Sequence, residues 1–301
     1  MKYRTLGRTG LKVSVVGIGT WQFGGEWGVD YTQSDVDAIL GKGKELGINL
    51  IDTAECYGDH LSEKLIGGYL RRDRREDWII ATKFGHHFHA HLKRDDRSSA
   101  EDVREQLEQS LRALGTDYID IYQFHSLSDE RFNNDDMWTM LDKQVQAGKI
   151  RHLGISIGYN GNIYQTKNAT KVKADVIQVV YNRLDRTPEE EVFPSCQDQN
   201  LGVLARVPLA SGFLSGKYSK DSVFPENDVR ASKGRNDPEG RIKMIEEVER
   251  IRKEEVPEGV NMAEWALAWC LKHPAVTAVI PGCKDPSQVE SNARAAELVQ
   301  E

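Results

Sequence analysis

The sequence predicts a single (β/α)8 barrel, the TIM-barrel fold, with an N-terminal β-hairpin that caps one end of the barrel. Eight short runs rich in Val and Ile alternate with longer stretches of helical periodicity, which is typical of parallel β/α units. The 301 residues are enough for one large hydrophobic core, so we expect one domain over residues 1–301. An open doubly wound sheet is the alternative arrangement of the same units.

The elements are predicted in the following order. Residues 3–6 and 11–14 flank Gly7-Arg-Thr-Gly10 and form the expected hairpin. The stretches between the later strands carry helical spacing, as in Val103, Leu107 and Leu111. Because helices then cover every outward strand face, a closed barrel is favoured. The eight predicted barrel strands are residues 15–19, 50–52, 78–82, 119–124, 152–156, 176–181, 202–206 and 276–281.

Two glycine-containing segments need a separate interpretation. The stretch from Gly41 to Gly47 resembles a dinucleotide-binding fingerprint, but its last spacing is wrong and it precedes a strand. We therefore interpret it as a helix that ends at Gly47. Residues 219–241 have low hydrophobicity and contain Pro225, Gly234 and Pro238, which predicts a long loop after the seventh strand.

Composition excludes several classes of protein. Hydrophobic residues make up 39% and charged residues 29%, and no apolar run approaches the ~18 residues that cross a bilayer. The N-terminus lacks the apolar stretch of a secretory signal, which points to the cytoplasm. The net charge of -7 indicates no general nucleic-acid-binding surface. We expect neither a membrane nor a nucleic-acid partner, and the sequence leaves the oligomeric state open.

The four cysteines are scattered without a metal-like C-x-x-C spacing, which is typical of reduced thiols in a cytosolic enzyme. Cys56 stands out because it lies beside a tyrosine in the loop after the second strand. A redox-sensitive thiol is one interpretation of Cys56, and a small buried filler is the commoner role.

Four polar residues are expected to meet at one end of the barrel. Asp52 ends the second strand, Tyr57 lies in the loop that follows it, Lys83 follows the third strand, and His125 follows the fourth. The carboxyl ends of barrel strands all open on the same face, so these side chains can form one site. Each residue alone is explained by helix capping or packing. Their combination at three successive strand ends favours a site.

The chemistry of the four residues is consistent with proton transfer to a carbonyl. A phenol with a pKa near ~10 is a poor acid unless a nearby cation stabilises its phenolate, and Lys83 is that cation. A buried Asp52 would balance the charge of Lys83. His125 would hydrogen-bond the substrate oxygen and orient it toward Tyr57, a role that needs no positive charge.

The segment Asp52-Thr-Ala-Glu-Cys-Tyr57-Gly58, the triplet Ala-Thr-Lys83 and the strand that ends in His125 resemble the catalytic motifs of the aldo-keto reductase family. The resemblance covers essentially the whole chain. It implies an oxidoreductase that reduces aldehydes or ketones by hydride transfer from NADPH, with Tyr57 as general acid and without a metal. Further segments that resemble the family, in family order, are Gly19-Thr20-Trp21 and residues 114–122, 148–156, 178–182, 208–218 and 280–282.

The resemblance also implies a set of cofactor contacts. Ser156 and Gln178 have the donors and acceptors to hold a nicotinamide carboxamide. Arg206 lies where many family members place an aromatic residue on the nicotinamide ring, and a guanidinium plane can also stack. The remaining implied contacts are Gly19, Thr20, Trp21, Asp52, Pro208, Leu209, Ser211, Gly212, Lys217, Gly282, Lys284, Gln288 and Asn292.

The choice between NADPH and NADH depends on the adenosine end. Lys284 is placed to meet a 2′-phosphate, and no acidic residue has an equally obvious ribose-binding position, so NADPH is favoured over NADH. Two departures from the family pattern weaken this preference. Asp285 is adjacent to Lys284, and Gln288 replaces an arginine found in many NADPH-specific relatives.

The predicted substrate pocket for a small-molecule carbonyl lies in the first and third barrel loops. Trp21, Phe23 and Trp27 form either an apolar wall or the packing of the first loop. His86 and Phe88 are the expected substrate contacts of the third loop. Because four histidines occur within residues 86–91, metal binding is an alternative there. We expect substrate contact or solvation, and no metal.

Two other functions remain as alternatives at this stage. A cofactor-binding regulatory or scaffold subunit with little turnover would keep the same fold and site. A barrel lyase or isomerase without nicotinamide would require the cofactor-contact residues to be incidental.

Overall fold

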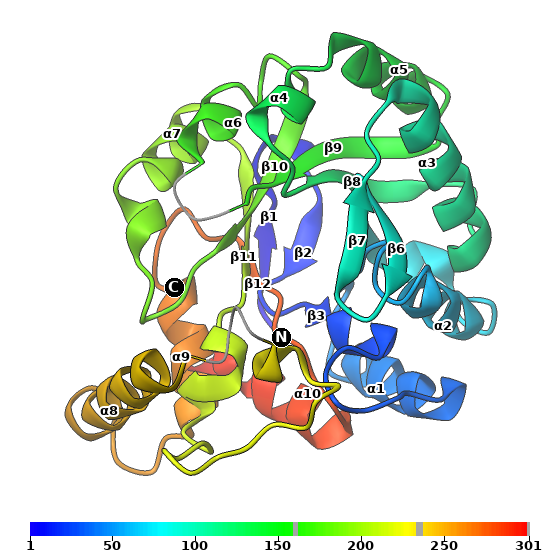
Figure 1. Ribbon diagram of the computed structural model, residues 1–301. Coiled ribbons are helices and arrows are strands. Elements are labelled where there is room, and N and C mark those ends of the chain that lie inside the picture. Colours follow the sequence, from blue (N-terminus) through cyan, green and yellow to red (C-terminus); the bar gives the residue numbers. More distant parts are fainter. Residues whose placement is uncertain (159–161, 233–236, 300–301) are drawn as a thin grey trace.

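The computed structural model describes residues 1–158, 162–232 and 237–299, and within them eight parallel strands form one sheet (Figure 1). Isolated parallel bridges join Val16 to Val279 and Gly19 to Gly282, so the two edges of the sheet meet. The barrel is therefore closed, as predicted. Its strands, in spatial order, are β12 (Ala278–Val279), β11 (Gly202–Arg206), β10 (Ala174–Val180), β9 (Ile150–Ser156), β8 (Ile119–His125), β5 (Ile79–Phe84), β4 (Leu50–Asp52) and β3 (Ile18–Gly19).

An antiparallel hairpin closes the bottom of the barrel and confirms the predicted cap. It consists of β1 (Tyr3–Thr5) and β2 (Lys12–Ser14), which pair in register Arg4 to Val13. Leu6 and Val13 are fully buried and pack against apolar side chains inside the barrel. The approach is close, because a Cβ at Gly7 would lie 2.3 Å from the nitrogen of Gly202.

Helices surround the strands (Figure 1). The stretch that contains Gly41 lies within α1 (Gln33–Glu45), as predicted, and Gly47 follows with a φ of +78°. Helix α1 begins at a capping box, in which Thr32 pairs with Asp35. The remaining helices are α2 (Leu61–Leu70), α3 (Ala100–Leu114), α4 (Asp129–Phe132), α5 (Asp135–Gln146), α6 (Ile163–Lys167), α7 (Val192–Asp198), α8 (Pro238–Glu254), α9 (Met262–Leu271) and α10 (Pro286–Arg294).

The structure corrects three local predictions. Residues 86–91 belong to an antiparallel hairpin of β6 (His86–Ala90) and β7 (Lys93–Asp96), where we expected a plain loop. The loop predicted over residues 219–241 ends earlier, because α8 begins at Pro238. Gly234, one of the residues that predicted this loop, lies outside the described residues. The first and eighth strands are shorter than predicted, because single bridges close the barrel there. No helix in the described ranges is long and apolar enough to cross a membrane.

Candidate active site

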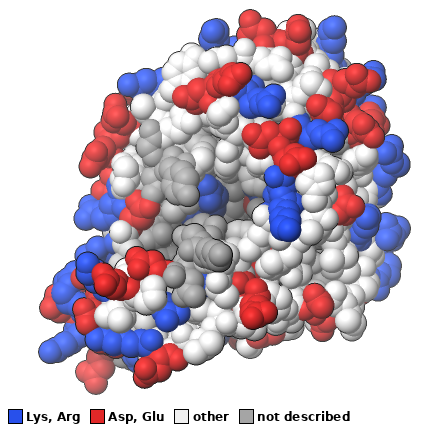
Figure 2. Space-filling model, in the orientation of Figure 1, with Lys and Arg blue, Asp and Glu red and all other residues white. Residues whose placement is uncertain are grey.

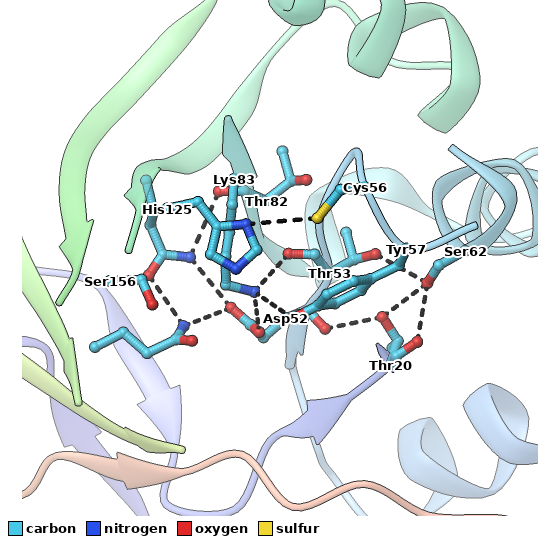
Figure 3. Close-up of polar contacts among 12 residues, drawn as sticks. Thr20, Asp52, Thr53, Cys56, Tyr57, Ser62, Thr82, Lys83, His125 and Ser156 are labelled. Carbon is cyan, nitrogen blue, oxygen red and sulfur yellow. Dashed lines mark hydrogen bonds and ion pairs between the residues drawn. The ribbon is translucent and has the colours of Figure 1, made fainter. Parts of the chain in front are cut away.

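The four predicted catalytic residues lie together at the carboxyl ends of β4, β5 and β8 (Figure 3). The Lys83 Nζ donates to Asp52 Oδ1 at 2.6 Å, to the Thr53 carbonyl oxygen at 2.7 Å and to the Tyr57 hydroxyl at 3.2 Å. An ammonium group has three hydrogens, and these partners use all of them. Lys83 is therefore held with its charge beside the phenol oxygen.

Two glutamine amides hold the other oxygen of Asp52. Its Oδ2 accepts from Gln178 Nε2 at 2.7 Å and from Gln123 Nε2 at 3.1 Å, and Gln178 also donates to Gln123 Oε1 at 3.0 Å. Asp52 and Lys83 are only 3% and 1% exposed. A buried ion pair is tolerated when further hydrogen bonds satisfy both partners, as they do here.

Gln123 is a site residue that the sequence analysis missed. It lies on β8 two residues before His125, so both side chains face the same side of the strand. A polar residue on the strand face that also carries Ile119, Ile121 and His125 was the available signal.

Burial dominates the ionisation of Tyr57. It raises the pKa of Tyr57 to about 12, and the Lys83 charge lowers that pKa only in part because Asp52 opposes it. Burial alone would lower the pKa of Lys83, but Asp52 and Tyr57 raise it above its ordinary value. At neutral pH the site therefore holds a protonated phenol beside an ammonium. Lys83 lowers the pKa of Tyr57, as the sequence analysis expected, but burial raises that pKa by more.

His125 is a neutral imidazole. Burial, then the neighbouring His86, Lys83 and Arg206, hold the pKa of His125 well below its usual range. Its Nδ1 lies 3.7 Å from the Cys56 Sγ, and burial raises the pKa of the Cys56 thiol. A thiol that keeps its proton donates to Nδ1, which leaves the Nε2 hydrogen for another acceptor. The Tyr57 and His125 rings meet edge to face at 6.2 Å.

The ends of β9 and β10 fit a primary carboxamide. The Ser156 Oγ is buried and has no hydrogen-bond partner among the described residues. Gln178 uses its amide hydrogens on Asp52 and Gln123, so its carbonyl oxygen is the atom left for a ligand. A carboxamide needs both a donor and an acceptor, and these two residues supply them.

Residues 208–212 turn sharply after β11. Ala210, Ser211 and Gly212 have positive φ values of 47°, 58° and 94°, which is unusual for successive residues. The Ser211 carbonyl accepts from Arg230 Nη1 at 3.4 Å, and Asp228 holds the guanidinium through bonds of 2.8 and 2.6 Å. Arg230 thus braces the turn, a role that the sequence analysis missed.

Most residues predicted to contact the adenosine end of the cofactor form hydrogen bonds within their own loop and helix. The Asp285 carboxylate accepts from the backbone N–H of Gln288 and caps α10. Gln288 Oε1 accepts from the Lys284 backbone N–H at 2.9 Å, and Asn292 Nδ2 donates to the Gly282 carbonyl at 3.5 Å. The Lys284 side chain is exposed, and its Nζ has no carboxylate within ion-pair distance in the described structure.

Some aromatic residues of the first barrel loop lie beside the site, and one lies in the core. Trp21 stacks on Tyr57 with ring centroids 6.0 Å apart, and Trp27 meets Trp21 edge-on at 5.3 Å. Phe23 is fully buried and packs against Tyr31, which corrects its assignment to the pocket wall. Burial of the apolar Phe23 ring in the core, away from water, is favourable.

Other predicted residues have the following positions. Thr20 Oγ1 donates to the Asp52 carbonyl oxygen at 2.9 Å, so its hydroxyl is used within the fold. The Arg206 Nη2 donates to the carbonyls of Ile157 and Gly158 at 3.1 and 2.9 Å. Pro208 is buried, Leu209 is half-buried, and Lys217 is exposed.

The third barrel loop is fastened to the first by a buried carboxylate that the sequence analysis missed. Glu26 is 1% exposed and accepts from Trp21 Nε1 at 2.6 Å, from the Leu92 backbone N–H at 2.8 Å and from the Arg94 guanidinium. The β6–β7 hairpin is thereby fixed beside the site. The predicted contacts on it lie near the site entrance: the His86 ring is 5.0 Å from that of His125. Phe88 lies under Arg94 at 5.8 Å.

The face of the molecule seen in Figure 2 is hollowed near its centre, and Lys or Arg side chains lie inside the hollow. In sum, the described site holds a buried, protonated phenol, an ammonium beside it, a neutral imidazole and an adjacent place for a carboxamide. This arrangement can donate a proton to an oxygen that develops negative charge.

Comparisons with known proteins identify relatives of this chain. Residues 15–301 match the model of the Aldo/keto reductase family. The chain is 33% identical to an NADH-specific methylglyoxal reductase of Escherichia coli, over 99% of this chain and 94% of that protein. It is 31% identical to the aldo-keto reductase yakc [NADP(+)] of Schizosaccharomyces pombe, over 85% and 76%. The holo form of an aldo-keto reductase from Bacillus halodurans superposes with a TM-score of 0.80 at 31% identity, over 99% and 91%.

Proposed function

Because the chain belongs to the aldo-keto reductase family of nicotinamide-dependent oxidoreductases, we propose that it reduces small aldehydes or ketones to alcohols with NADPH and that Tyr57 is the general acid. The observation that carries the proposal is the contact of Lys83 with both Asp52 and the Tyr57 hydroxyl. That contact supports a phenol that can give up a proton and leave a stabilised phenolate.

The roles of the side chains follow from their positions. Bound NADPH would supply the hydride for the carbonyl carbon. Tyr57 gives its proton to the carbonyl oxygen as negative charge develops there, and Lys83 stabilises the phenolate that remains. His125 donates its Nε2 hydrogen to the same oxygen and so fixes the direction of protonation. Asp52 keeps Lys83 charged and in place.

The cofactor contacts are proposed on the same basis. Ser156 and Gln178 would hold the carboxamide. The buried Ser156 hydroxyl has no partner among the described residues, and the Gln178 carbonyl oxygen is left as an acceptor. Preference for NADPH is supported by the exposed Lys284, which is free to meet a 2′-phosphate. It is also supported by Asp285, whose carboxylate is already engaged in capping α10.

Binding and turnover are tested together. The apo protein is titrated with NADPH and with NADH while tryptophan fluorescence is followed, and loss of reduced-nicotinamide absorbance is then measured against a panel of aldehydes and ketones. We expect tighter binding of NADPH and turnover with at least one carbonyl. Binding of either cofactor without turnover would favour the regulatory subunit, and no binding would contradict the proposal.

A further inference from the structure

Three different ligand atoms gather beside the proposed reaction site. Glu55, Cys56 and His125 each bring one potential metal ligand, and these atoms all lie within 4.8 Å of one another. Glu55 and Cys56 lie in the loop after β4, whereas His125 ends β8, so the fold brings the three together from different parts of the chain. Oxygen, sulfur and nitrogen in one cluster are a ligand set of the kind that zinc uses.

The sulfur and nitrogen already have the separation that a shared metal ion requires. Bonds of about 2.3 Å to sulfur and about 2.0 Å to nitrogen at a tetrahedral angle place these ligands roughly 3.5 Å apart. The Cys56 Sγ and His125 Nδ1 are 3.7 Å apart. Figure 3 shows the two side chains facing each other across this gap.

The carboxylate of Glu55 is the second, independent observation. Glu55 is 3% exposed, and its Oε1 accepts from the His86 backbone N–H at 3.0 Å. Its Oε2 is buried and has no hydrogen-bond partner in the described parts of the chain. A buried carboxyl oxygen without a partner is unfavourable, and a bond to a cation would satisfy it.

We propose that Glu55, Cys56 and His125 bind a thiophilic divalent cation such as Zn²⁺, with the fourth coordination position open to a water molecule. Binding forms three metal–ligand bonds without any redox change, and the protons of the Cys56 thiol and the Glu55 carboxyl group pass to solvent. Sulfur and nitrogen ligands favour Zn²⁺ or Co²⁺ over Mg²⁺. Entry is through the mouth, because His125 is partly exposed there.

Occupancy of the site inhibits carbonyl reduction, a consequence that rests on the proposed function. The metal fixes His125 through Nδ1 and adds a cation beside the point at which the substrate oxygen would bind. The imidazole is then no longer free to follow that oxygen during proton transfer. The cation is therefore an inhibitor and has no part in the reaction.

Binding is tested on the full chain with Co²⁺, whose bond to a thiolate gives a charge-transfer band in the near ultraviolet. We expect one equivalent of Co²⁺ to produce this band and Zn²⁺ to abolish it. Cys56→Ser should lose the band, and Cys196→Ser, at a buried cysteine of α7, should keep it. A cation on the exposed His87 and His89 would give no thiolate band.

Glu55→Gln provides a second test in case Cys56→Ser fails to fold. It should keep the thiolate band but raise the Co²⁺ dissociation constant at least about tenfold. No band in the wild-type protein, or the same affinity in Glu55→Gln, would overturn the site.

Inhibition is measured separately. Zn²⁺ should inhibit the wild type and Cys196→Ser but spare Cys56→Ser. A thiolate band without inhibition would overturn the inhibitory role alone. If the protein shows no reductase activity, the proposed function fails while the Co²⁺ titration still decides the site.

Discussion

Replacing Asp52 by Asn tests whether the buried ion pair organises the site. The substitution removes the charge that balances Lys83, which is 1% exposed. It also places an amide N–H₂ where Oδ2 accepts from Gln123 and Gln178, so at least one buried donor loses its acceptor. Breaking a buried pair from one side costs about 3–5 kcal/mol of the free energy of unfolding.

That loss should be measurable in two ways. Urea unfolding followed by tryptophan fluorescence should give the loss in free energy directly, provided that refolding is complete. A chain of this length has an unfolding entropy of about 0.6 kcal/mol per kelvin, so the same loss lowers the melting temperature by roughly 5–8 °C. Asp142→Asn is the matched control, because it breaks an exposed pair with Lys173 and should cost about 0–1 kcal/mol.

A double variant separates charge from shape. In Asp52→Asn with Lys83→Met no ammonium is left buried, so the pair of substitutions should destabilise less than Asp52→Asn alone. The reasoning is refuted if Asp52→Asn is as stable as Asp142→Asn to within about 1 kcal/mol.

Three further predictions concern the loops and the cofactor. Glu26→Gln should loosen the β6–β7 hairpin and speed hydrogen exchange at the Leu92 amide; unchanged exchange would contradict the role of Glu26 as its anchor. Burial raises the pKa of Glu55 from 4.5 to about 8, so the folded chain holds a proton that the unfolded chain releases in this window. The free energy of unfolding should therefore fall as pH rises from about 5 to 8, by up to about 1.4 kcal/mol per pH unit. In Glu55→Gln the free energy of unfolding should fall less steeply with pH. Equal slopes for the two proteins in urea unfolding would refute this. Lys284→Met should weaken NADPH about tenfold and leave NADH unchanged in a fluorescence titration; equal weakening of both would remove Lys284 from the 2′-phosphate site.

The parts of the fold that follow from sequence pattern were predictable. Alternating apolar strands and amphipathic helices predicted a closed barrel, and strand ends predicted that Asp52, Lys83 and His125 would meet. Gln123 could have been predicted in the same way, because a residue two positions before His125 lies on the same face of the strand.

Other features depend on contacts between distant loops, which leave little local pattern. The β6–β7 hairpin turns at Leu92 with a positive φ, where no Gly or Asn marks a turn. Glu26 and Arg230 look like ordinary surface charges in the sequence, yet both are buried. Glu26 binds Leu92 and Arg94 of a distant loop, and Arg230 binds Asp228 and Tyr218. The pKa of Tyr57 was also beyond sequence reasoning, since burial outweighs the charge of its neighbour.

The most direct test of the proposed chemistry is a comparison of Tyr57→Phe with the wild type. The substitution removes the phenol oxygen while keeping the ring that stacks with Trp21. With NADPH saturating and a carbonyl that the wild type reduces, single-turnover oxidation of NADPH should fall at least about 100-fold. The dissociation constant of NADPH, measured by tryptophan fluorescence, should change less than about threefold. Oxidation by Tyr57→Phe at the wild-type rate would contradict the assignment of Tyr57 as the proton donor.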